Sequence, residues 1–325
     1  MNIEKSQVNR ILVITLSNIG DIILTTPVIK ALKEEFPQAR IDVMVGPDGR
    51  GIFERDPAVF KLIIYDKHLP ITEKRRLQLK LKKLRYDLVA DLRNTVFPML
   101  IGPKFRTSTI QRFPNSLLHS RAKHLYRLKS FGMNVRNPSS YIHIPKEDDE
   151  YISALIAKEN ISGQFVVINP GAKSHIKRWS EEGFATIADR IVSECGMKVI
   201  FIGTDNDKEV VAATAIKMKG VYHNFVNKTN IRQLAALIKR SRLLITNDSA
   251  PLHLACAVGA KVLAIFGPTN PKKYGPTGEL DFVISKKLHC SPCENAQCAY
   301  DHECMKLISA EEVFNSAKVM VEGYE

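Results

Sequence analysis

The sequence predicts an α/β protein made of two domains, each built on a parallel sheet. Its 325 residues suit two domains better than one. Apolar residues make up 45% and charged residues 25%, which is typical of globular proteins and excludes a disordered chain, a collagen and a coiled coil. Each half of the chain also opens in the same way, with an apolar run, a loop, a helix pattern and a second strand.

The first half begins with Arg10–Leu16, a continuous apolar run typical of a strand buried on both faces. A loop over residues 17–21 leads into a helix pattern from Ile22 to Phe36. A basic stretch, Thr72–Leu84, has leucines spaced i, i+4 and i+7, which predicts an amphipathic helix. Further strands are expected at Ile41–Val45, Lys61–Tyr65 and Asp87–Leu92.

The second half repeats this pattern from Phe165–Asn169, which is again a buried-strand run. A loop over residues 170–178 precedes a helix that ends near Cys195, and Ser180 is suited to begin it as the N-cap. Strands are then expected at Lys198–Gly203, Leu243–Thr246 and Val262–Gly267, and helices at Ile231–Lys239 and Pro251–Ala257.

The two domains are expected to span residues 1–160 and 161–325, and the last helix is a candidate to pack back on the first domain. The acidic run Glu147–Glu150 and the turn at Ser162-Gly163 indicate the linker. Ligands of such folds bind at the carboxyl ends of the strands, so the cleft between the domains is the expected site.

The positive charge is confined to one segment. The net charge is +13, and residues 61–129 hold 17 Lys and Arg against 4 Asp and Glu, a difference of 13. Such an excess indicates an anionic partner, which can be nucleic acid, a membrane surface or a phosphorylated substrate. No run of 18 apolar residues and no signal peptide are found, so we expect neither a membrane-spanning helix nor secretion.

Four cysteines near the end of the chain are closely spaced. Cys290, Cys293, Cys298 and Cys304 form the pattern C-x2-C-x4-C-x5-C. This spacing is compatible with zinc, with an iron–sulfur cluster or with reduced thiols in a compact loop. We expect no metal and no cofactor, and keep zinc as the minor alternative.

Loops that follow the expected strands carry the candidate site residues. Asp21 enters the first turn of a helix, where it either caps that helix or projects as a general base. Lys173, Lys177 and Arg178 follow a Pro-Gly turn, and suit either a diphosphate or a solvated loop. Other candidates at strand ends are Asp205 for ribose hydroxyls, Asp248 and Ser249 beside a helix N-terminus, His253 in its first turn, and Thr269.

The order of these motifs resembles a known family. The chain contains Ser-x-x-Gly-Asp-x(4)-Thr-Pro, then Pro-Gly-Ala-x(4)-Lys-Arg-Trp, Asn-Asp-Ser-x-x-x-His and Phe-Gly-Pro-Thr-x-Pro. This series is similar to that of the lipopolysaccharide heptosyltransferases of glycosyltransferase family 9. The resemblance implies the GT-B fold, in which two Rossmann-like doubly wound domains face each other across a cleft. It also implies inverting transfer of heptose from ADP-heptose to a lipid-linked core acceptor of the lipid A–Kdo type.

The resemblance also assigns roles to individual residues. Asp21 matches the general base, and Lys177 matches a lysine that contacts the donor diphosphate. Where some members carry paired hydroxyl residues, this chain has Ala172 and Lys173, and Ser174 is the candidate to substitute. The remaining donor-binding positions are Asp205, Asp248, Ser249, Ala250, His253 and Thr269.

Acceptor and membrane contacts are expected from the basic segment, in particular from Arg75, Arg76, Lys82 and Lys83. With the resemblance, this surface suggests that the protein docks from the cytoplasm on the anionic inner membrane and holds the lipid-linked acceptor. We also expect a monomer. The alternatives are a family member with another donor or acceptor and, more distantly, a nucleic-acid-binding protein. The heptose position and the acceptor-contacting residues are not determined by the sequence.

Overall fold

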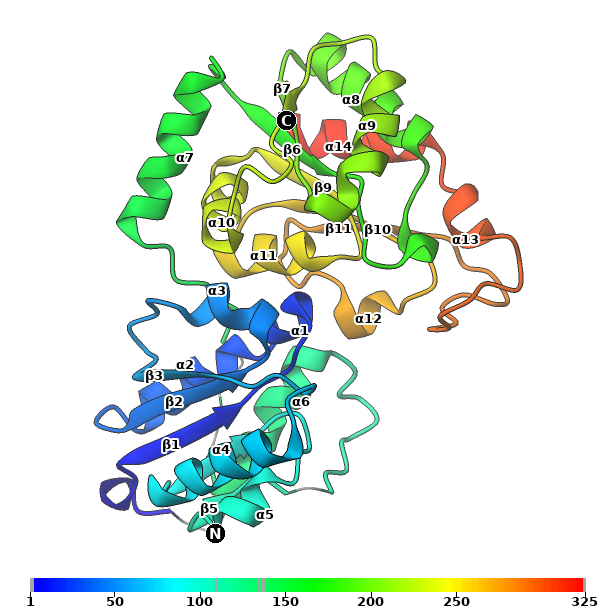
Figure 1. Cartoon of the computed structure of the whole chain (residues 1–325). Coiled ribbons are helices and arrows are strands. Elements are labelled where there is room, and N and C mark those ends of the chain that lie inside the picture. Colours follow the sequence, from blue (N-terminus) through cyan, green and yellow to red (C-terminus); the bar gives the residue numbers. More distant parts are fainter. Residues whose placement is uncertain (1–2, 109, 134, 136–137, 324–325) are drawn as a thin grey trace. The chain divides into compact units, whose positions relative to one another are not determined.

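The computed structural model describes residues 3–108, 110–133, 135 and 138–323 (Figure 1). The chain forms two compact units, unit 1 over Met1–His143 and unit 2 over Ile144–Glu325. This division lies earlier than the predicted boundary after residue 160. The acidic run that suggested a linker instead begins helix α7 (Lys146–Lys158), which packs on α10 (Ile231–Arg240) of unit 2.

Helix α7 is fixed to unit 2 by a buried ion pair. Arg232 Nε of α10 donates to Asp148 Oδ2 at 2.6 Å, and both side chains are at most 9% exposed. Asn230 Nδ2 donates to the other carboxylate oxygen of Asp148 at 3.1 Å. Acidic residues in the first turn also favour a helix, because they face the positive end of its dipole. The acidic run therefore stabilises a helix here.

Unit 1 contains a five-stranded parallel sheet in the order β3-β2-β1-β4-β5. Its register pairs Ile11 with Ile41 and with Leu88, so the central strand is buried on both faces. The predicted strands are thus confirmed in place. The strands are β1 (Arg10–Ile14), β2 (Arg40–Val45), β3 (Lys61–Ile64), β4 (Leu88–Asp91) and β5 (Phe105–Arg106).

The helix predicted over Ile22–Phe36 is divided in two, α1 (Ile19–Ile23) and α2 (Thr26–Glu35). Pro27 lies in the first turn of α2, where its missing N–H costs no helical hydrogen bond, and Thr25 turns back to donate to Ile22 O at 2.6 Å. The other helices of unit 1 are α3 (Arg50–Phe53), α4 (Ile71–Lys83), α5 (Phe97–Ile101) and α6 (Ser120–Tyr126), with 3₁₀ turns η1 (Lys5–Gln7), η2 (Pro47–Gly49) and η3 (Arg127–Phe131).

Helix α4 confirms the predicted amphipathic pattern. Leu81 is buried, and Leu77 and Leu84 pack beside it against the sheet residues of the same cluster. Its basic side chains lie on the opposite side, where Arg75, Arg76, Lys82 and Lys83 are all exposed.

Unit 2 contains a six-stranded parallel sheet in the order β11-β10-β9-β6-β7-β8. The central strands are fully buried, as expected of a parallel sheet covered on both faces. The strands are β6 (Phe165–Asn169), β7 (Lys198–Phe201), β8 (His223–Asn224), β9 (Leu243–Asn247), β10 (Val262–Phe266) and β11 (Phe282–Ser285).

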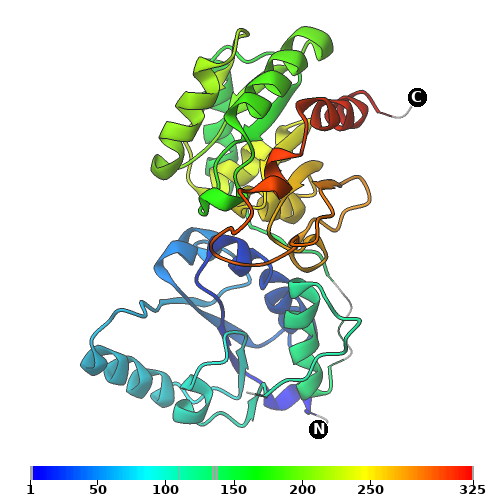
Figure 2. The same cartoon turned by 90° about the vertical axis from the view of Figure 1, so that its right-hand side faces the viewer.

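Helices cover both faces of this sheet (Figure 2). One face packs on α8 (Glu181–Cys195) and α14 (Ala310–Glu322), and the other packs on α10 and α11 (Ala250–Val258). Ser180 Oγ accepts from Gly183 N at 3.1 Å, so the predicted N-cap is confirmed. The remaining helices are α9 (Lys208–Ile216), α12 (Pro271–Tyr274) and α13 (Glu303–Lys306), with 3₁₀ turns η4 (His175–Lys177) and η5 (Asp205–Asp207).

The last helix packs within unit 2. Val313, Phe314, Ala317 and Val321 of α14 are buried in the same cluster as Phe184, Ile187 and other residues of α8. Its apolar face is thus covered within unit 2, and the alternative that this helix packs back on the first domain stays a prediction. Among the described residues, no helix is long and apolar enough to cross a bilayer.

Candidate active site

In both sheets the strand order reverses at one point, and the loops there carry the candidate residues. In unit 2 the reversal lies between β6 and β9, and in unit 1 it lies between β1 and β4. Open α/β sheets bind ligands beside the carboxyl ends of the strands at such a point, because the connections diverge there. Asn169, Asp248 and Ser249 lie at this point in unit 2, and Asp21 follows β1 in unit 1.

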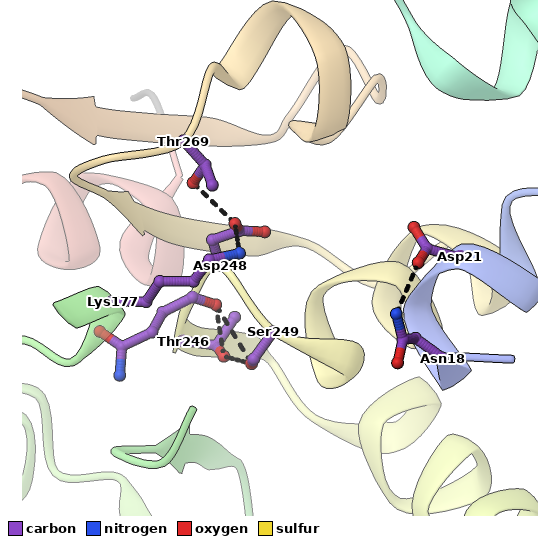
Figure 3. A network of polar contacts seen from close by, with 8 residues as sticks. Asn18, Asp21, Lys177, Thr246, Asp248, Ser249 and Thr269 are labelled. Carbon is purple, nitrogen blue, oxygen red and sulfur yellow. Dashed lines mark hydrogen bonds and ion pairs between the residues drawn. The ribbon is translucent and has the colours of Figure 1, made fainter. Parts of the chain in front are cut away.

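Lys177, Asp248 and Thr269 form a compact polar contact in unit 2 (Figure 3). Lys177 Nζ donates to Asp248 Oδ2 at 2.6 Å, and Thr269 Oγ1 donates to the same oxygen at 2.7 Å. The Asp248 side chain is only 6% exposed, whereas that of Lys177 is 30% exposed. The buried carboxylate therefore fixes an ammonium group that still reaches solvent. An ammonium has three N–H donors, so this pair leaves donors for an anionic ligand.

A second group of polar residues supports the start of α11. Asn169 Nδ2 donates to Thr246 Oγ1 at 3.1 Å and to Ser249 Oγ at 3.0 Å, and the two hydroxyls lie 3.0 Å apart. Because Ser249 Oγ is engaged in this way, it makes no cap hydrogen bond to α11. The N-terminus of α11 is therefore not capped by this side chain, and its helix dipole favours negative charge there.

Sequence reasoning missed Asn169 and Thr246. Both side chains are at most 3% exposed and lie inside strands that otherwise contain apolar residues. A buried polar residue at the carboxyl end of a central strand is the signal that could have identified them, because such a group must be hydrogen-bonded.

The basic side chains of the loop after β6 differ in their exposure to solvent. Lys173 is exposed and Ser174 is half-buried just before η4. Arg178 Nε donates to Ala172 O at 3.0 Å, so this arginine braces the loop. Gly171 allows a close approach, since a Cβ atom there would lie 2.2 Å from Asp207 Oδ1.

Asp205 is held by neighbours of its own. It follows β7 in η5, where its Oδ1 lies 2.5 Å from Lys208 Nζ and also accepts from Asn227 Nδ2. The hydrogen bond from Lys208, followed by that from Asn227, lowers the pKa of Asp205. The carboxylate is exposed and ionised, and a role toward ribose hydroxyls stays a prediction. His253 is buried in the first turn of α11.

Asp21 lies in the first turn of α1 in unit 1 and is half-buried. Asn18 Nδ2 donates to Asp21 Oδ2 at 3.1 Å (Figure 3). At the strand ends of this sheet, Thr15 after β1, Gly46 after β2, and Arg93 and Thr95 after β4 line one shallow hollow. Asp21 is thus placed beside the strand ends that bind ligands in such sheets, with its orientation set by Asn18.

The four clustered cysteines line one small pocket of unit 2, together with Ile176 and Pro268. Burial, and then the neighbouring thiols, raise the pKa of Cys304. Cys298 Sγ accepts from the backbone amides of Tyr300 and His302 at 3.4 and 3.3 Å. Within the part of the chain that is described, no three His, Cys, Asp or Glu side chains are gathered closely enough for a metal ion. Zinc here stays a hypothesis that metal analysis of the purified protein would test.

The comparison with protein families decides the identity. The model of glycosyltransferase family 9 (heptosyltransferase) matches residues 104–303. The chain belongs to glycosyltransferase family 9. It is therefore an enzyme, a glycosyltransferase, and the resemblance stated from its motifs is confirmed.

Curated relatives of this family 9 enzyme match most of its length. It is 25% identical over 301 residues to the lipopolysaccharide core heptosyltransferase OpsX of Haemophilus influenzae, covering 84% of this chain and 83% of the relative. It is 26% identical over 317 residues to lipooligosaccharide heptosyltransferase 2 of Campylobacter jejuni, covering 94% and 96%.

Solved structures confirm the fold of the family 9 enzyme. The family 9 glycosyltransferase of Veillonella parvula superposes with a TM-score of 0.85 at 23% identity, over 99% of both chains. The ADP-heptose LPS heptosyltransferase II of Escherichia coli gives 0.78 at 21% identity, over 96% of this chain and 98% of the other. The predicted GT-B class with two Rossmann-like parallel-sheet domains is confirmed.

In this family 9 enzyme, the structure brings together four of the predicted donor-site residues. Lys177, Asp248 and Thr269 share one contact, and Ser249 follows Asp248 at the start of α11. Asp248 was predicted to bind the donor, but its carboxylate oxygen Oδ2 is engaged by Lys177 and Thr269. This contact orients Lys177, and a direct contact between Asp248 and the donor stays a prediction.

Proposed function

We propose that the chain is an inverting heptosyltransferase that moves heptose from ADP-heptose to a lipid-linked inner-core acceptor of lipopolysaccharide. The observation that carries this proposal is the Lys177–Asp248–Thr269 contact at the strand-order reversal of unit 2, in a member of family 9. A fixed cation beside the N-terminus of α11 suits a nucleoside diphosphate. The names of the curated relatives support heptose as the sugar.

The proposed reaction is one displacement at the anomeric carbon. The acceptor oxygen forms the new glycosidic bond while its proton passes to the Asp21 carboxylate. The bond between the anomeric carbon and the phosphate oxygen breaks, and the electron pair leaves with ADP. Lys177 and the positive end of the α11 dipole stabilise the negative charge that develops on the departing diphosphate.

A transfer assay tests this function against its alternative, a family 9 enzyme with another donor or acceptor. Purified protein is offered ADP-heptose, UDP-sugars and GDP-sugars with acceptors truncated at successive core positions. We expect transfer from ADP-heptose to one of the inner-core acceptors. Transfer from a UDP- or GDP-sugar, with none from ADP-heptose, would contradict ADP-heptose as the donor and support the alternative.

The basic face of α4 is proposed to dock on the cytoplasmic leaflet of the inner membrane. Its cations Arg75, Arg76, Lys82 and Lys83 are exposed and, among the residues that the structure describes, make no ion pair. Apolar side chains protrude nearby, Leu79 from α4 and Met99 from α5, which are 57% and 59% exposed. Helices α4 and α5 are in contact, since Gln78 Nε2 donates to Leu100 O at 3.3 Å. Cations beside protruding apolar groups are typical of interfacial helices.

Reversal of four charges on α4, at Arg75, Arg76, Lys82 and Lys83, is expected to weaken binding to anionic vesicles on the order of 1,000-fold, since each cation contributes about 1 kcal/mol. Turnover of a vesicle-embedded acceptor should fall in parallel. Sedimentation with phosphatidylglycerol vesicles measures binding, with phosphatidylcholine vesicles for comparison. The matched control reverses four exposed lysines of unit 2, Lys158, Lys198, Lys219 and Lys287. Equal binding of both variants would contradict the docking face.

A further inference from the structure

Arg127 in unit 1 is a buried cation with an unused hydrogen-bond donor. It is only 7% exposed, and its Nη1 donates to Asn94 Oδ1 at 2.8 Å. Its Nε is buried and has no hydrogen-bond partner among the described residues. Buried polar groups in folded proteins are almost always hydrogen-bonded, so this exception needs a physical reason.

The turn after β4 builds the support for Arg127. Asp91 ends β4, and its Oδ1 accepts from Arg93 N at 2.9 Å. Its Oδ2 accepts from N and Oγ1 of Thr95 at 2.6 and 2.9 Å. Asn94 lies within this turn in the left-handed region, with φ of 57°. The carboxylate of Asp91 is therefore used to shape the turn that presents Asn94 to Arg127.

The positive charge of Arg127 is partly balanced by the carboxylate of Asp91 and by the ring of Phe113. Burial lowers the pKa of Arg127, and the charge of Asp91 acts in the opposite sense. The guanidinium also lies over the ring of Phe113, with Cζ 5.5 Å from the ring centroid. Lys123 Nζ lies 5.9 Å from the same centroid, so two cations adjoin this ring.

A second unused nitrogen lies one helical turn away. His124 Nδ1 is buried and has no hydrogen-bond partner in the described parts of the chain. Burial, and then the charge of Arg127, lower the pKa of His124 to about 4. The imidazole is therefore neutral near pH 7 and can present an N–H donor. We call Arg127, His124 and Asn94 the Arg127 cradle.

The cradle belongs to the ligand-binding edge of the sheet. Asn94 follows β4, and Asp21 follows β1, the two strands between which the strand order of unit 1 reverses. A ligand at this edge can therefore reach both the proposed base and the turn that holds Arg127. A guanidinium with an unused N–H group is complementary to an oxyanion, which arginine binds with charge-assisted hydrogen bonds.

We propose that Arg127 binds an anionic oxygen group of the sugar acceptor, either a carboxylate or a phosphate, and so selects charged acceptors. The identity of the acceptor rests on the proposed function, whereas the anion site rests on the geometry of unit 1. This proposal explains why Arg127 Nε has no hydrogen-bond partner among the described residues. The bound anion would supply that partner.

The decisive variant is Arg127→Met, which keeps the volume and removes the charge and donors. We expect at least a tenfold rise in the acceptor KM, an unchanged donor KM, and a Tm that is not lowered, because replacing an incompletely paired buried charge by an apolar group is often neutral or stabilising. Arg127→Lys restores the charge without the paired donors and should recover activity only in part. Arg112→Met removes an exposed arginine of the same segment and serves as the matched control.

Acceptor analogues identify the anion. One analogue has its carboxylate reduced to an alcohol, and another lacks its phosphate. With the wild type, one of the two analogues should show an acceptor KM raised as much as Arg127→Met raises it for the parent acceptor. The Arg127→Met variant should have the same KM for that analogue and for the parent acceptor. The proposal is overturned if Arg127→Met leaves the acceptor KM unchanged, if it impairs charged and neutral analogues equally, or if it lowers Tm and activity together.

A binding measurement separates this proposal from the proposed function. Inorganic phosphate and a free sugar acid are each tested for their effect on Tm. A rise in the wild type that is absent in Arg127→Met supports the cradle, even where no heptose transfer is found. The opposite result is also distinguishable. If the wild type transfers heptose but neither anion raises its Tm, and Arg127→Met keeps the acceptor KM, the proposed function stands and the anion site at Arg127 is rejected.

Discussion

Asp21→Asn is expected to lower kcat by about 10²- to 10⁴-fold, the usual contribution of a general base. The amide keeps the size and the contact with Asn18 but cannot take the proton of the acceptor hydroxyl. Donor binding should be preserved, because the donor contacts are assigned to unit 2. Single-turnover transfer measures the chemical step, and equilibrium titration with ADP measures donor binding.

Asp48→Asn is the matched control for this prediction. Asp48 is exposed and lies in η2, just beyond the carboxyl end of the neighbouring strand β2. The same chemical change there should leave kcat within about twofold, because surface substitutions away from a site have small effects. Near-normal turnover of Asp21→Asn would remove Asp21 from the role of base and return it to a structural one.

Lys177→Ala is expected to lower kcat/KM for the donor by about 10²- to 10³-fold, which corresponds to ~3–4 kcal/mol of lost charge stabilisation. The variant also leaves Asp248 buried with Thr269 as its remaining partner at Oδ2, so Tm should fall as well. Transfer kinetics and thermal denaturation with and without ADP measure the two effects.

Asp248→Asn separates positioning from binding. If Asp248 acts through Lys177, the two single substitutions should each impair transfer, and the double variant Lys177→Ala/Asp248→Asn should be little worse than Lys177→Ala. Lys198→Ala, at the start of β7 and exposed, is the control for loss of a lysine. Full additivity in the double variant would show that Asp248 contributes independently of Lys177.

Local patterns were sufficient for the elements around the site. The apolar runs predicted β1, β6, β9 and β10, and the helix start at Ser180 was predicted from this serine and the residues that follow it. These features depend on side chains within a few residues of one another. The acidic run at the start of α7 was misinterpreted because its partner, Arg232, is far away in the sequence.

The motifs by themselves determined the family, the two-sheet fold, and the loops that carry Asp21, Lys177 and Asp248. Only the tertiary structure decided what these side chains contact. Lys177 and Asp248 are 71 residues apart, and Asn169 and Thr246 are 77 apart, yet each pair is hydrogen-bonded because β6 and β9 are neighbours in the sheet. The burial of Arg127 beside the turn after β4 was likewise invisible in the sequence. Strand periodicity is local, whereas the contacts at the strand ends depend on which strands are adjacent in the sheet.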